Sequence, residues 1–194
     1  MVFQKRNIFI FVLIVVLGTI LGTMGTISFP IGTNMSYFWP GAVIQTVSGI
    51  LFGWWGVVAA TLFPVFSNAL TDGNFVHVFG LIPTNFVQSA LPYLIFQRMN
   101  FTTSLKTTKE VTLFCFFCAG FPHFLGGILG CVTLFVFGVI ANYSDFYTTL
   151  QTWWIGNIPC SIVFSLLIIK YVTPALRLSK LLYDEDLGSH DKKE

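Results

Sequence analysis

The basic residues of this chain are confined to three short stretches. All ten Lys and Arg residues lie at 5–6, 98–109 and 170–193, and the two long intervals 7–97 and 111–169 contain a single charge each, Asp72 and Asp145. A soluble surface needs charged residues every few positions, whereas a bilayer-spanning segment excludes them at a cost of about 2.5–3.5 kcal/mol each. The charge pattern therefore predicts an integral membrane protein.

The composition and the sidedness of the basic residues support the same class. The chain is 55% hydrophobic and 9% charged. Short basic loops stay in the cytoplasm, so we expect both termini and the 98–110 linker on the cytoplasmic side of the cell membrane. The basic residues flank apolar segments and do not form a stripe, so the net charge of +2 does not indicate a nucleic acid partner. We therefore predict a multi-pass, N-in/C-in protein whose main surroundings are the lipid bilayer.

The apolar intervals divide into six predicted helices. As one helix, residues 40–70 would be about 46 Å long, which exceeds the bilayer core. Gly53-Trp54-Trp55-Gly56 lies near the middle and can turn the chain, and a hairpin there keeps every Lys and Arg inside. We expect an all-α membrane domain over 1–183, with helices at about 8–27, 40–53, 54–70, 83–97, 111–135 and 156–172, followed by a charged cytoplasmic tail at 184–194.

Proline marks the start of three of these predicted helices, at Pro40, Pro83 and Pro159. Each is followed by a β-branched apolar residue four positions later and by Ser or Thr six positions later. Proline favours the first helical turn because its missing N–H is not needed there. Either these prolines are ordinary start signals, or three helix N-termini converge on one outward pocket and direct free N–H groups into it.

Amide and aromatic side chains gather on the outer side of this topology. A single amide is explained by a helix–helix hydrogen bond, and a single Trp by the interfacial aromatic belt. Together, with no Lys or Arg on that side, they predict a pocket for a small, planar, largely uncharged ligand. The candidate ligand-binding residues are Trp39, as a lid from the first outer loop, and Asn85, Gln88, His123, Trp153 and Asn157.

Histidine and cysteine side chains are further candidates for ligand contact or metal binding. His123, inside an apolar helix, either contacts the ligand or bonds to a neighbouring helix, and His77 in an outer loop is the weaker candidate. Cys115 and Cys118 have CxxC spacing, but without a second pair or a nearby histidine they are read as packing residues. Because GxSxG, HExxH and Walker A motifs are missing, we expect no enzyme, no cofactor and no metal site. No acid lies within a predicted helix, so the chain shows no energy source of its own.

Gly18 and Gly22 form a GxxxG motif in the first predicted helix. Small residues let another helix approach closely. That helix belongs either to a partner protein or to this chain.

Three stretches of the chain carry longer motifs: Phe38-Trp39-Pro40-Gly41, the run from Gly49 to Gly56, and Trp154-Ile-Gly156-Asn157-Ile158-Pro159. With six short helices and the small-residue stripe, they resemble the substrate-binding S component of energy-coupling factor (ECF) vitamin transporters, over about residues 8–178. The resemblance implies a protein that binds a vitamin-like or heterocyclic small molecule at its outer side. It also implies association, through the first helix, with a transmembrane T subunit that carries two ATPases. Gly18 and Gly22 would then be the docking residues.

A second class of membrane protein shares some of these features. Trp-Pro-Gly at 39–41 and Leu-Phe-Gly at 51–53 also resemble the membrane-integral sensor domains called MASE1. Those domains are usually larger and fused to a cytoplasmic output domain, for which the 14 residues after Lys180 are too few. The alternative is therefore a sensory or regulatory membrane module, and a purely structural bundle is a third interpretation. Co-purification with an ATPase distinguishes the first interpretation from the others.

Overall fold

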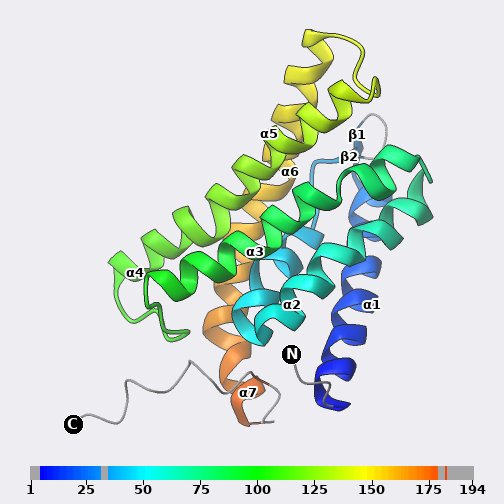
Figure 1. Ribbon diagram of the computed structural model, residues 1–194. Helices are drawn as coiled ribbons and strands as arrows, with labels where there is room; N and C mark the ends of the chain where they lie inside the picture. Colours follow the sequence, from blue (N-terminus) through cyan, green and yellow to red (C-terminus); the bar gives the residue numbers. More distant parts are fainter. Residues whose placement is uncertain (1–4, 32–34, 179–181, 183–194) are drawn as a thin grey trace.

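The structure is a computed structural model, which describes residues 5–31, 35–178 and 182. It is a bundle of long helices, shown in Figure 1. In the described part of the chain, five helical segments are long and apolar enough to cross a membrane. This confirms the predicted all-α class and is compatible with a multi-pass membrane protein. The predicted 184–194 tail lies outside the described residues. The five segments are Lys5–Ser28, Gly41–Thr71, Val76–Arg98, Thr108–Val136 and Tyr143–Leu178.

Several of these segments join an α-helix to a π-helical stretch. The first, α1 (Lys5–Ser28), is followed by a short antiparallel pair, β1 (Pro30–Ile31) and β2 (Met35–Ser36). The later elements are α2 (Gly41–Thr71), a π-helix (Val76–Gly80), α3 (Ile82–Arg98), α4 (Thr108–Leu113), a π-helix (Phe114–Gly120), α5 (Phe121–Val136), α6 (Tyr143–Leu167), a π-helix (Ile168–Val172) and α7 (Thr173–Leu178).

Helix α2 folds back on itself at Gly53. This residue has φ 62° and ψ −149°, a backbone conformation that glycine adopts readily. A straight helix separates residues eight positions apart by about 12 Å. Val57 is eight residues after Gly49, yet a Cβ on Gly49 would lie only 2.8 Å from the Val57 side chain. Farther from the turn, the rings of Trp39 and Phe63 stack with their centroids 5.9 Å apart. The two arms of α2, before and after the glycine, therefore run side by side, and the turn falls in the predicted Gly-Trp-Trp-Gly motif.

Gly18 and Gly22 face the second arm of α2, and both are buried. A Cβ on Gly18 would lie 2.5 Å from the Phe63 ring, and one on Gly22 would lie 2.8 Å from the Ser67 hydroxyl. Thr23 also donates a hydrogen bond to the Ser67 hydroxyl at 3.3 Å. The sequence left open whether the helix packed on these glycines belongs to a partner protein or to this chain. The structure shows a helix of this chain, α2, in contact with them. Helix α2 therefore fills the space that their missing side chains leave, and the role of both glycines in docking a partner stays a prediction.

This packing predicts that Gly18→Leu destabilises the fold. The added side chain would collide with Phe63, and overpacking of a close interface typically costs about 1–3 kcal/mol. Thermal unfolding in detergent measures the change. The matched control is Val16→Leu on the exposed face of the same helix, which should unfold at the parent temperature. Equal melting temperatures for Gly18→Leu and the parent would contradict the packing of α1 on α2.

The last long helix begins earlier than predicted. Helix α6 starts at Tyr143, not near residue 156, because the Asn142 side chain caps it by accepting a hydrogen bond from the Asp145 N–H at 2.9 Å. Pro159 therefore lies inside α6. Pro40 and Pro83 do stand at the starts of α2 and α3. The prediction that three prolines begin helices is wrong for Pro159, and a convergence of three proline-marked N-termini does not occur.

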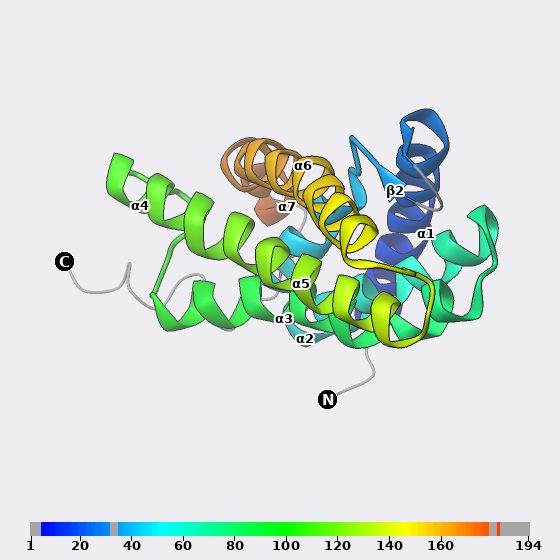
Figure 2. The ribbon, with the colours of Figure 1, turned by 90° about the horizontal axis from the view of Figure 1, so that it is seen from above.

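The helices enclose a shared centre. Helix α2 contacts α1, α3 and α6, while α5 contacts α3 and α6, so four helices surround the middle of the bundle. Figure 2 shows this arrangement from above, with α5 beside α3 and α6. The start of α1 and α7 lie toward one end of the bundle. The connector between α2 and α3, the β1–β2 pair and the loop between α5 and α6 lie toward the other end.

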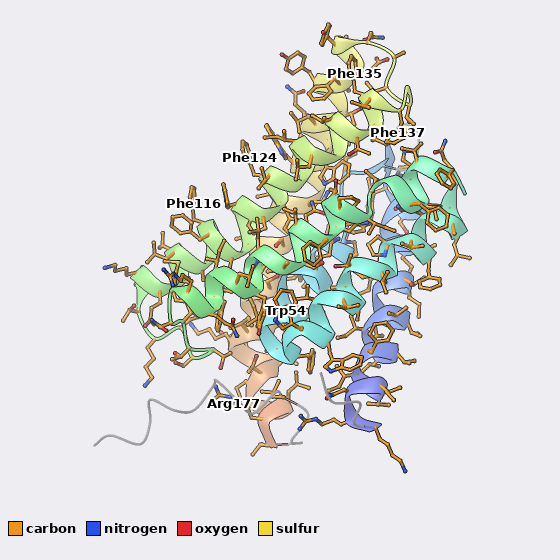
Figure 3. The ribbon with its side chains drawn as sticks, in the orientation of Figure 1. Trp54, Phe116, Phe124, Phe135, Phe137 and Arg177 are labelled. Carbon is orange, nitrogen blue, oxygen red and sulfur yellow. The ribbon has the colours of Figure 1, made fainter. Side chains whose placement is uncertain are left out.

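The outer surface of the bundle is apolar. Large aromatic side chains project outward from α5 and its neighbours, as Figure 3 shows for Phe116, Phe124 and Phe137. Phe116 is 62% exposed and Phe137 is 63% exposed. Contiguous apolar surface of this kind is unfavourable in water and suits contact with lipid chains. Arg177 lies at the opposite end of the molecule from Phe137.

Candidate ligand-binding site

A small cavity gathers five of the six predicted ligand-binding residues. It has a volume of about 60 Å³, which is room for a few water molecules or a small chemical group. The side chains of Ser36, Asn68, His77 and Leu81 contribute to its walls, so the cavity lies at the end of the bundle that carries the β1–β2 pair and the α2–α3 connector. The predicted residues that line it are Trp39, Asn85, Gln88, Trp153 and Asn157.

Four polar atoms of these cavity residues are buried without a hydrogen-bond partner in the described part of the chain. They are Asn85 Nδ2, Gln88 Nε2, Trp153 Nε1 and Asn157 Oδ1. A buried polar group without a partner costs about 1–3 kcal/mol, and such groups in native proteins normally meet water or a ligand. The residues that line the cavity thus carry three N–H donors and one carbonyl acceptor that have no partner in the described chain.

Two of the cavity amides, Asn85 and Asn157, are anchored through the other polar atom of the side chain. Asn85 Oδ1 accepts a hydrogen bond from Gln45 Nε2 at 3.2 Å, and Asn157 Nδ2 donates to the Trp153 carbonyl at 2.8 Å. Gln45 is fully buried, so the bond between α2 and α3 lies in the interior. A joint rotation of Gln45 and Asn85 would preserve that bond and present the Asn85 oxygen to the cavity instead. These two hydrogen bonds fix the positions of Asn85 and Asn157 and leave one polar atom of each side chain without a partner in the described chain.

Glycines on α5 make room for two of the lining side chains. A Cβ on Gly126 would meet Gln88, and a Cβ on Gly130 would lie 2.5 Å from the ring of Trp153. Sequence reasoning missed both glycines as determinants of the site. Their four-residue spacing, which places them on one helix face, was the available signal.

His123 does not line the cavity with the other five candidates. It is fully buried, and its Nε2 lies 3.0 Å from the Thr46 hydroxyl. The Thr46 and Ser161 hydroxyls are 2.7 Å apart, and Ser161 donates to the Ala119 carbonyl at 3.0 Å. These bonds tie α5 to α2 and α6. His123 therefore bonds to a neighbouring helix, which is one of the two roles that the sequence allows, and its contact with a ligand stays a prediction.

His77 was ranked below His123 from the sequence, and the structure reverses that order. The residue is 4% exposed and lines the cavity. Its Nδ1 lies 2.5 Å from Asp72 Oδ2, and its carbonyl accepts a hydrogen bond from Asn68 Nδ2 at 2.6 Å. The sequence contained one signal for this arrangement. Asp72 is the single charge in a long uncharged interval, and it stands five residues before the histidine.

Comparison of the chain with protein-family models, with curated proteins and with solved structures found no match.

Proposed function

We propose that this protein is a membrane subunit that binds a small, largely uncharged, vitamin-like or heterocyclic molecule for uptake. It would work with an ATP-driven ECF module made of a T subunit and ATPases. The observation that carries the proposal is the cavity, where two Trp rings and three amides converge with four unpaired buried polar atoms. A mainly apolar site with a few directed polar groups is typical of small-molecule recognition.

The side chains of the site favour binding over catalysis. Amides and indoles form directed hydrogen bonds, and indole rings offer broad surfaces for stacking, but neither group transfers protons at neutral pH. Trp39 and Trp153 line the cavity beside Asn85, Gln88 and Asn157. Such a set can hold and select a molecule without changing it. We therefore propose a binding role for these five residues.

A topology with six spans and a cytoplasmic N- and C-terminus supports uptake from outside. The break at Gly53 lets α2 enter and leave the membrane from the same side, and the basic residues at 5–6 and Arg177 lie toward the end remote from the α2–α3 connector. Asp72, which lies in that connector, stands at the opposite end. Because Lys and Arg are retained in the cytoplasm, the cavity would open toward the outer face.

Cysteine labelling tests this orientation. Ser104 lies in the loop between α3 and α4 and Thr148 near the start of α6, and both are exposed. With the four native cysteines replaced, a Cys at 148 should react with an impermeant maleimide on intact cells. A Cys at 104 should react only after the cells are opened. Labelling of position 104 from outside would contradict the proposed topology.

The positions of the acidic residues favour a separate source of energy for uptake. In the described spans the acids stand near helix ends, as Asp72 and Asp145 do, and proton- or ion-coupled transport usually uses an acid within the membrane. The work of uptake would then come from a separate ATPase. This step rests on the resemblance of residues 8–178 to S components.

Affinity purification from cells that encode the protein tests this partnership. We expect T and ATPase subunits to co-purify, and uptake of the bound molecule to depend on ATP. Capture of a signalling protein, with no ATPase and no uptake, would instead support the sensory module similar to MASE1.

A further inference from the structure

The α2–α3 connector places an acid–histidine pair at the wall of the cavity. His77 is almost fully buried and lines the cavity, and its Nδ1 is 2.5 Å from Asp72 Oδ2. The Asp72 side chain is 26% exposed, so the pair reaches from the protein surface to the cavity wall. Of the residues that line the cavity in the described chain, His77 alone carries an ionisable side chain.

The connector holds this pair in one arrangement. The other Asp72 oxygen, Oδ1, accepts a hydrogen bond from the Asn74 N–H at 3.0 Å. Asn74 Oδ1 in turn accepts from the Val76 N–H at 2.9 Å, and Asn68 holds the His77 carbonyl. These bonds fix both the backbone around the histidine and the direction of the carboxylate. The ring of His77 is therefore oriented before any ligand arrives.

The carboxylate also decides what the ring offers to a ligand. With Nδ1–H donating to Asp72, Nε2 of the neutral ring is an acceptor. In the described part of the chain, Nδ1 is the ring nitrogen of His77 that has a hydrogen-bond partner, which leaves Nε2 for a ligand. The histidine thus adds a directed acceptor to a cavity that already has the donors of Asn85, Gln88 and Trp153 and the acceptor of Asn157.

We propose that His77, positioned by Asp72, selects the ligand by accepting a hydrogen bond from it. Because unpaired N–H donors and acceptors both occur among the residues of the same small cavity, the matching ligand class is a neutral cyclic amide or ureide, with a ring C=O beside a ring N–H. The C=O accepts from the Trp153 and Gln88 donors, and the N–H donates to His77 Nε2. This assignment rests on the proposed function of the cavity and names the chemistry of its substrate.

A carboxylate ligand fits the site less well. Lys and Arg do not occur among the described residues that line the cavity, and the Asp72 carboxylate contacts His77 at its wall. An anion in a buried site needs a compensating charge or several donors to offset the loss of hydration. The His77–Asp72 pair leaves no spare positive charge for that purpose.

Two small probes of equal size separate this role from simple packing. In 2-pyrrolidinone the ring C=O adjoins an N–H, and in γ-butyrolactone an oxygen replaces that N–H. A site built to accept an N–H rejects the analogue that lacks it, because the acceptor is then left unpaired. Ligand-observed NMR on the protein in nanodiscs should show tighter binding of the lactam, and weaker binding of pyroglutamate, which adds a carboxylate.

Variants of the pair then assign the discrimination to His77. In Asp72→Asn the amide can donate to Nδ1 and turn Nε2 into a donor, and His77→Phe removes the acceptor while keeping a ring. Both variants should weaken lactam binding at least fivefold and leave lactone binding unchanged. Asp145→Asn, an exposed acid at the start of α6, is the matched control and should behave as the parent.

The possible failures are distinguishable. Equal weakening of lactam and lactone in both variants would show that the pair only supports the fold, and would overturn the assignment. If the parent binds its own co-purified molecule but none of the probes, the ligand class is wrong while the proposed function stands. If neither the probes nor a co-purified molecule binds, the proposed function itself fails.

Discussion

A Gly130→Leu variant is expected to fold and yet to lose ligand binding. The ring of Trp153 lies so close to Gly130 that a Cβ there would stand 2.5 Å from it. The ring must therefore shift, and the cavity of about 60 Å³ has no room for both a displaced indole and a ligand. Exclusion by volume should reduce affinity below detection, while overpacking costs about 1–3 kcal/mol of stability. Titration with the co-purified molecule and thermal unfolding measure the two effects separately.

Gly127 offers a control one helical turn away on α5. A Cβ there would lie 2.7 Å from Trp154, which stacks on Phe124 and does not line the cavity. Gly127→Leu should therefore lose stability to a similar degree while keeping its ligand affinity. If the Gly130 and Gly127 variants lose affinity equally, general damage to α5 explains the loss, and Trp153 does not form the wall of the site.

Truncation of the cavity amides should weaken binding without closing the cavity. Removing one buried hydrogen-bonding partner costs about 1–3 kcal/mol, which corresponds to about 5- to 150-fold in affinity. We expect this range for Asn157→Ala and for Asn85→Ala. The second variant also leaves Gln45 Nε2 without its acceptor, so its stability should fall as well. Titration of each variant with the co-purified ligand gives the affinities.

The matched control for these substitutions is Gln151→Ala, an exposed amide on α6. It should bind the ligand as tightly as the parent. If Asn157→Ala and Asn85→Ala also match the parent, the amides serve only the packing of helices, and the ligand site lies elsewhere.

The all-α fold with several helices long and apolar enough to cross a membrane was readable, because exclusion of charge from lipid acts on each residue separately. The same local logic found the turn at Gly53, where two glycines flank two Trp residues within an interval too long for one span. It also grouped five residues that line one cavity in the structure, since polar side chains in apolar helices need a shared interior: Trp39, Asn85, Gln88, Trp153 and Asn157. The rank of the two histidines was not readable. It depends on how the α2–α3 connector folds over the cavity, which is a tertiary feature.

The errors have identifiable physical causes. Pro159 looked like a helix start, but a proline is tolerated inside a membrane helix, and the true cap is Asn142. Gly18 and Gly22 correctly predicted the close approach of another helix, but the motif does not identify which helix that is. That neighbour is α2 of the same chain, brought alongside α1 by the reversal at Gly53. A sequence pattern indicates how a segment packs, whereas the helix against which it packs depends on the tertiary structure.

Native mass spectrometry of the detergent-purified protein tests the central claim most directly. If the cavity is a binding site, the parent should carry a small molecule in a one-to-one ratio. Gly130→Leu should carry none, and Gly127→Leu should retain it. A parent that carries no small molecule after purification from cells that encode it, or a Gly130→Leu variant that carries as much as the parent, would contradict the account.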